Sequence, residues 1–386
     1  MRRTAWGVMI LGGALALTAV AACKREAAPE PVAIAPIPID ANLRPDANPK
    51  PPTVRTSVRC AECHGKMADE WRGSRHAGSA SSPLYLQLAH GDEACASCHA
   101  PLAALLGPDD LAGKEGVTCD VCHTISKVDL AAQPRFTLAA WDMVKYGPLC
   151  DAKDHYFHRM GCSTVHALAE LCGACHQRVL ATASGEVPLY TTYDEWKQSA
   201  YPAEGWVCQD CHMPGVRAPA AEGEPPREGV PDHGFFGGGD LRKDAAKLEL
   251  SSHALDGGRV FEAAITNYAG HDMPSGFPGK RVVLRVIARD RAGKEVARHE
   301  QAFGRRLVDD HNQPTAYAGA VRVASDDRLK PKERRAITLF EGHALSGATA
   351  LEADLVWQSI DPVLAAPLGV AVESRTIVHT RMKVTR

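Results

Sequence analysis

Five copies of one short motif dominate the chemistry of the first half of the chain. In each copy two residues separate a pair of cysteines, and a histidine follows the second cysteine directly. The copies are Cys60–Cys63–His64, Cys95–Cys98–His99, Cys119–Cys122–His123, Cys172–Cys175–His176 and Cys208–Cys211–His212. A cysteine pair can hold zinc or cycle as a redox dithiol, but neither use requires the adjacent histidine. Covalent haem does require it, because the sulfurs bind the porphyrin and the imidazole reaches the iron from the same side.

Five such motifs in one chain favour haem over zinc or chance matches. We therefore predict five covalently attached haem c groups, with the motif histidines as proximal iron ligands. A haem that only carries electrons needs a second ligand on its far face, whereas a vacant face points to substrate binding. The chain has 17 histidines, so 17 − 5 = 12 remain as candidates.

The amino terminus has the pattern of an export signal. Two arginines precede an uncharged apolar stretch over residues 8–20, and small residues lead to Cys23. This pattern predicts a lipoprotein-type signal peptide at residues 1–22, with lipidation of Cys23. An ordinary cleaved signal with an incidental cysteine is the alternative, and it also exports the chain. The proline-rich residues 23–57 are expected to form a semi-rigid, lipid-anchored tether.

The cysteine count predicts one disulfide. Of 13 cysteines, ten lie in the motifs and Cys23 is expected to carry lipid, which leaves Cys150 and Cys162. An exported protein meets oxidising conditions, in which leftover thiols are normally paired. We expect these two cysteines to close a short loop, worth about 3 kcal/mol by loop entropy.

The segments around the motifs resemble a known family. "EWRGSRHAGS", "EGVTCDVCHT" and "YDEWKQSAYPAEGWVCQDCHMP" are similar to stretches of multihaem cytochromes of the cytochrome c-554/c-prime type, over about residues 58–236. Those proteins carry electrons in the periplasm or at the cell surface. The resemblance implies that the distal iron ligands are His76, His158, His166 and His233.

A fifth distal ligand is implied by the loop "NYAGHDMPSGFPGKR". It resembles a Gly-His-x-x-Pro-x-Gly loop that follows the haem domain in relatives with a similar tail, so His271 is the candidate. The alternative is that His271 only bonds the backbone of its own loop. If His271 is not a ligand, His90 or His155 could replace it, or one iron is open.

One segment occurs twice. "EWRGSRHA" from Glu70 is echoed by "EWKQSAYP" from Glu195, with Tyr201 at the position of His76. A phenol is a poor ligand for a low-spin haem, so the second copy cannot supply a ligand as the first copy does.

The elements that position these residues fall into two domains. A multihaem cytochrome c domain at residues 58–240 is expected to be mostly α-helix and coil, because five porphyrins form much of its core. Apolar residues at helical intervals in "STVHALAELCGAC" favour a long helix there. Residues 245–386 lack cysteine and contain six or seven alternating segments, which predict an all-β immunoglobulin-like sandwich without helix.

These features predict an electron-transfer protein. The net charge of −2 argues against nucleic acid or an anionic bilayer surface as partner. Redox proteins, such as other cytochromes or quinol-linked donors, are the expected partners, and the lipid anchor is the expected membrane contact. The alternatives are a reductase of a small nitrogen or sulfur oxyanion or of hydroxylamine, which needs one open iron, and an adhesion module with structural haems.

Overall fold

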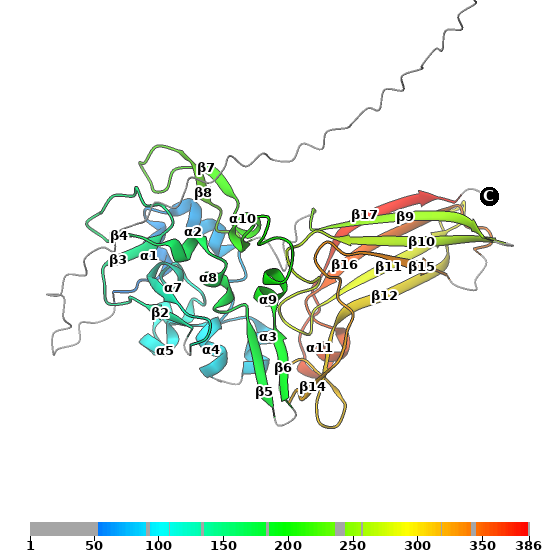
Figure 1. The fold of residues 1–386 in the computed structure, drawn as a ribbon, viewed down its shortest axis with the longest axis horizontal. Helices are drawn as coiled ribbons and strands as arrows, with labels where there is room; N and C mark the ends of the chain where they lie inside the picture. The colour runs from blue at the N-terminus through cyan, green and yellow to red at the C-terminus, as the bar shows by residue number, and fades with distance from the viewer. Residues whose placement is uncertain are drawn as a thin grey trace, which may run out of the picture. The chain divides into compact units, whose positions relative to one another are not determined.

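The computed structural model describes residues 53–386, apart from 90–92, 108, 133–134, 183–184, 236–243, 256–257, 318, 341–344 and 385–386. Residues 51–386 form one compact unit (Figure 1). The predicted signal peptide, Cys23 and the tether up to residue 52 lie outside the described residues. Among the described helices, none is both long and apolar enough to cross a membrane.

Residues 53–57, which belong to the segment expected to be a tether, make contacts with the rest of the chain. The amide of Thr53 donates to the carbonyl of Ala140 at 2.6 Å, and Val54 is buried in a small apolar cluster. The amide of Ser57 donates to Glu115 at 2.8 Å. Residues 53–57 therefore pack on the part of the chain that carries the motifs, residues 58–235, which is called the haem-motif half here.

The haem-motif half contains helices of four to eight residues (Figure 1). Each motif lies in such a helix or beside one. Local caps begin some of them; for example, the Thr118 hydroxyl accepts from the amide of Val121 at the start of the third motif. The helices are α1 (Ser57–Ala61), α2 (Gly65–Arg72), α3 (Pro83–Ala89), α4 (Glu93–His99), α5 (Ala103–Leu106), α6 (Leu111–Lys114), α7 (Cys119–Thr124), α8 (Glu170–Gly173), α9 (Thr192–Lys197) and α10 (Cys208–His212).

The long helix expected at "STVHALAELCGAC" is wrong. A 3-10 helix, η1 (Thr164–Ala167), comes first, and α8 follows it. Between them Leu168 has an extended backbone, with φ −107° and ψ 148°. An extended residue cannot continue the hydrogen-bond ladder of a helix, so the segment is divided in two.

Short strand pairs also occur in this half, so the expectation of α-helix and coil is incomplete. Three pairs are antiparallel and one, β3–β4, is parallel. The pairs are β1 (Ile125–Val128) with β2 (Phe136–Leu138), β3 (Val144–Gly147) with β4 (Arg159–Cys162), β5 (Arg178–Thr182) with β6 (Gly185–Tyr190), and β7 (Gly215–Ala218) with β8 (Arg227–Pro231).

Residues 244–384, called the β domain here, contain two antiparallel sheets (Figure 1). One has the order β15-β10-β9, and the other has the order β13-β12-β11-β16-β17 with β14 paired to β12. The strands are β9 (Ala246–Leu255), β10 (Gly258–Asn267), β11 (Arg281–Arg289), β12 (Glu295–Val308), β13 (Pro314–Thr315), β14 (Arg322–Asp326), β15 (Arg334–Leu339), β16 (Ala350–Gln358) and β17 (Ser374–Lys383).

Both sheets contribute to one hydrophobic core, which includes Ile265, Leu284, Phe303 and Leu355. Alternating burial along β11 and β16 matches their alternating sequence. The expectation of no helix here is wrong, because α11 (Pro362–Leu368) begins at Asp361, whose carboxylate accepts from the amide of Val363 at 2.9 Å. The immunoglobulin-like topology stays a prediction.

Candidate haem-binding site

Cysteines of different motifs lie in contact. The thiol of Cys60 lies within hydrogen-bonding reach of that of Cys119, as do the thiols of Cys98 and Cys175 and those of Cys172 and Cys208. Motifs that are far apart in the sequence therefore share one interior. Among the described residues, no three histidine, cysteine or acidic side chains are grouped to hold a single metal ion.

Four motif histidines each face a second histidine across a nearly constant gap. The ring centroids are 6.3 Å apart for His64–His158 and for His176–His76, and 6.2 Å apart for His123–His233 and for His212–His271. Two imidazoles that bind opposite sides of one iron at about 2 Å each have centroids roughly 6 Å apart. The four pairs therefore match the spacing that a haem iron requires.

Hydrogen bonds orient these rings. The Nδ1 atoms of His64, His123, His233 and His271 contact backbone carbonyl oxygens at 2.8, 2.6, 2.9 and 2.9 Å. An Nδ1–H that donates to a carbonyl leaves Nε2 unprotonated, which is the usual arrangement of a metal-binding histidine. His76 and His158 each have a buried Nδ1 without a hydrogen-bond partner in the described part of the chain.

Burial keeps the central imidazoles neutral. It is the main cause that lowers the pKa of His123 and His176 to about 3, and neighbouring histidines lower it further. Burial likewise lowers the pKa of His76 to about 4. Because neutral imidazole is the form that binds a metal, these residues fit haem ligation at neutral pH.

His166 also lies beside a motif histidine, and its ligand role stays a prediction. Its Nε2 contacts the carbonyl oxygen of Cys122 at 2.9 Å, so only a buried Nδ1 without a partner remains. Its ring lies 5.9 Å from that of His123, whereas the ring of His233 lies 6.2 Å from the same histidine and has its hydrogen bond at Nδ1. His233 is therefore the better distal partner for His123.

The second motif histidine lacks a matching histidine among the described residues. His99 lies 3.3 Å from the carbonyl oxygen of Ser79, and its ring stacks on Tyr85 with centroids 4.6 Å apart. That spacing is too short for an iron between the two rings. Two other histidines were alternative candidates for a distal ligand. His90 lies outside the described residues, and the backbone of His155 pairs with that of His158 in an isolated β-bridge.

The remaining cysteine pair lies beside a paired histidine. Cys150 and Cys162 form a disulfide with their Cα atoms 4.6 Å apart. Cys162 ends β4, the strand that directly follows His158. Strand β4 is also held by its parallel pairing with β3, so the backbone next to His158 is fixed by both the disulfide and the strand pair.

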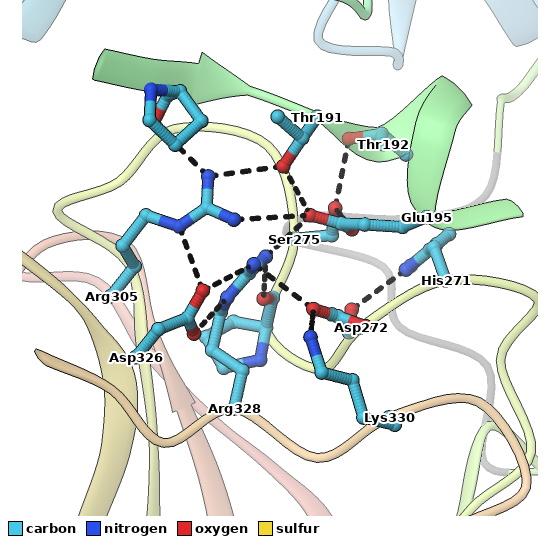
Figure 2. A network of polar contacts seen from close by, with 12 residues as sticks. Thr191, Thr192, Glu195, His271, Asp272, Ser275, Arg305, Asp326, Arg328 and Lys330 are labelled. Atoms are coloured by element: carbon cyan, nitrogen blue, oxygen red, sulfur yellow. Dashed lines mark hydrogen bonds and ion pairs between the residues drawn. The ribbon is translucent and has the colours of Figure 1, made fainter. Parts of the chain in front are cut away.

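A polar network beside His271 was not predicted from the sequence (Figure 2). It includes Glu195, Arg305, Asp326, Arg328 and Lys330. Glu195 stands out in the sequence only as part of the internal repeat, and nothing in the sequence pairs it with Arg328, 133 residues further on.

Two comparisons with known proteins give matches. Residues 59–124, which contain the first three motifs, match the family model "Cytochrome c554 and c-prime". The fold is similar to that of a penta-heme cytochrome c552 from Thermochromatium tepidum, with a TM-score of 0.70 and 22% sequence identity, covering 87% of this chain and 100% of that chain. No curated protein matches the sequence.

The mostly β carboxy-terminal half is part of the similar fold, since the alignment covers most of this chain. At this sequence identity the likeness shows the fold alone. The family match over residues 59–124 and the fold similarity together support a multihaem c-type cytochrome with covalent haem c.

Proposed function

We propose that this protein is an exported pentahaem cytochrome that transfers electrons through closely packed haems, most of which have two histidine ligands. The observation that carries the proposal is the spacing of 6.2–6.3 Å in four histidine pairs. Haem c would supply a one-electron iron couple at each motif. An iron held by two imidazoles has no free position for a substrate, so such sites favour electron transfer over catalysis.

In this proposal four of the five haems have both iron ligands named. The motif histidines His64, His123, His176 and His212 are the proximal ligands, and their distal partners are His158, His233, His76 and His271 in the same order. Contacts between cysteines of different motifs support short distances between neighbouring haems. Short distances allow electrons to pass from one site to the next.

The location and partners extend the proposal. The export pattern and Cys23 favour a lipid-anchored protein on the periplasmic side or at the outer membrane. The donor and acceptor would then be other exported cytochromes or quinol-linked proteins.

Mass spectrometry and a reductive titration test this function. The denatured mature chain should carry the mass of five haems, and full reduction should consume five electrons per chain. A mass of fewer haems would remove at least one motif from the assignment. Fewer electrons than bound haems would show that some sites are outside the conducting set.

A second function is favoured by the surroundings of His99, whose ring neighbour in the described part of the chain is Tyr85. An open iron at this motif would allow reduction of a small nitrogen or sulfur oxyanion or of hydroxylamine. Carbon monoxide binding to the reduced protein distinguishes the two functions. One molecule bound per chain supports an open haem beside four closed ones, and none supports electron transfer alone.

A further inference from the structure

Arg328 is the centre of a buried ion network (Figure 2). Its guanidinium contacts Glu195 at 2.6 Å, Asp272 at 2.9 Å and Asp326 at 2.7 Å. The side chains of Arg328, Glu195 and Asp272 are only 4%, 7% and 2% exposed. Buried charges of this kind bind strongly to one another, because removing one leaves its partners uncompensated in a medium of low polarity.

The network joins the haem-motif half to the β domain. Glu195 lies on α9, whereas Arg328 and Asp272 lie in loops of the β domain. Ser275 donates to Glu195 at 2.5 Å and also contacts Thr192 at 2.8 Å. The loop over residues 268–280 is therefore held against α9 directly by Ser275 and indirectly by Asp272, through Arg328.

The same loop carries His271, whose neighbour Asp272 is one of the three carboxylates bound by Arg328. Lys330 also contacts Asp272 at 2.6 Å, and the side-chain amide of Asn267 donates to the carbonyl oxygen of His271 at 2.9 Å. These contacts fix the backbone on both sides of His271, whose ring lies 6.2 Å from that of His212.

The internal repeat supports a positioning role for the glutamate. In the first copy Glu70 accepts from the backbone amide of His233 at 3.1 Å, and His233 is the partner of His123. In the second copy Glu195 binds, through Arg328, the carboxylate next to His271. Each copy thus uses its glutamate to hold a segment that delivers a distal histidine from elsewhere in the chain.

The tyrosine of the second copy has a related contact. Tyr201, which stands where the first copy has His76, donates to the carbonyl oxygen of Tyr268 at 2.6 Å. The second copy therefore binds the loop of the β domain at two points, Glu195 and Tyr201.

We propose that Arg328, together with Glu195 and Asp272, is a positioning device that holds His271 at the iron of the Cys208–Cys211–His212 motif. The proposal rests on the proposed function, since it requires a haem at that motif. It goes beyond that function by making ligation of one haem depend on an ion pair between the two halves of the chain.

Spin state is the measurement that tests this device. Arg328→Met keeps an apolar stem but removes the charge, so it should convert one haem of five from low spin to high spin in the electron paramagnetic resonance spectrum. Added imidazole should restore the low-spin signal, because the iron would have lost only its distal ligand. Arg328→Lys keeps the charge but cannot bond Glu195 and Asp272 together, so it should give a partial conversion and remains informative if the methionine variant does not fold.

Arg305→Met is the matched control. Arg305 is 9% exposed and contacts Asp326 at 2.9 Å and Glu195 at 3.8 Å, but among the described contacts it does not reach Asp272, the carboxylate next to His271. We expect all haems to keep their wild-type spin state in this variant. Equal high-spin conversion by Arg305→Met and Arg328→Met would overturn the proposal, since it would indicate general loosening of the interface.

His271→Ala separates this proposal from the function beneath it. If this variant gives one high-spin haem that imidazole rescues, while both Arg328 variants stay low spin, the ligand is right and the positioning device is wrong. If His271→Ala leaves every haem low spin, the ligand assignment itself fails, and the proposal about Arg328 falls with it.

Discussion

At the scale of single residues, each candidate ligand is oriented by what binds its other ring nitrogen. Carbonyl oxygens of Ala220, Tyr146, Pro231 and Asp272 hold four Nδ1 atoms, so the fold selects which nitrogen is left for iron. His166 is the informative exception, because the carbonyl of Cys122 takes its Nε2. Two histidines near His123 therefore differ in what they can do.

This difference gives a paired prediction. His233→Ala should convert the haem at His123 to high spin, because it removes the free Nε2 on the far side. His166→Ala should leave that haem low spin. Magnetic circular dichroism of the two oxidised variants measures the result, and the opposite pattern would return His166 to the position that the family resemblance implies.

The motif residues were predictable because their chemistry requires adjacent positions in the sequence. Distal ligands have no such constraint. His158 lies far along the chain from its partner His64, and His271 comes from the β domain. A family resemblance suggested five of them, and the structure brings all five beside a motif histidine, with His166 and His233 both beside His123. Only three-dimensional placement could separate His166 from the others.

At the scale of elements, short pieces of structure support the ligands. Strand β4 continues directly from His158, pairs with β3 and ends at Cys162, which is bonded to Cys150. The disulfide therefore closes a loop that contains His158. The disulfide stabilises the fold mainly because it restricts the conformations of this loop in the unfolded chain.

Replacing both cysteines by serine should lower the free energy of unfolding by about 3 kcal/mol, the value expected for a short loop. It should also weaken retention of His158 as a ligand, so the haem at His64 should become partly high spin. Chemical unfolding and absorbance in the high-spin charge-transfer band measure the two effects. Unchanged stability would show that the disulfide does not constrain this loop.

Sequence pattern predicted the elements whose burial alternates or whose ends are marked. Strands β10, β11, β16 and β17 follow the expected alternation closely. Strand β9 was missed although "AKLEL" alternates apolar and charged residues, because this alternation ends at Ser251 and Ser252 after only five residues. Helix α11 was missed because Pro362 and Pro367 obscure a helical pattern that Asp361 nevertheless begins.

At the scale of the whole molecule, the two halves are joined where haem ligation is completed. His271 of the β domain faces His212, and the ion network around Arg328 lies beside this pair. The sequence could suggest this junction only through a loop resemblance, because buried ion pairs between distant segments leave no local pattern. The β domain is thus expected to complete one redox site as well as to extend the protein.

Anchoring is a prediction for the whole protein. Cys23→Ala should move the cytochrome from the membrane fraction to the soluble exported fraction, because lipidation requires the thiol. Fractionation followed by haem staining measures the change, with the wild-type protein as control. A variant that stays with the membrane would show that the anchor lies elsewhere.

Integrated electron paramagnetic resonance of the oxidised wild-type protein counts the haems whose iron has two histidine ligands. The four histidine pairs predict that at least four of five haems are low spin, with any high-spin signal equal to one haem and assigned to His99 by its loss in His99→Ala. Two or more high-spin haems per chain would contradict the account, since at least one of the four pairs would then not hold an iron.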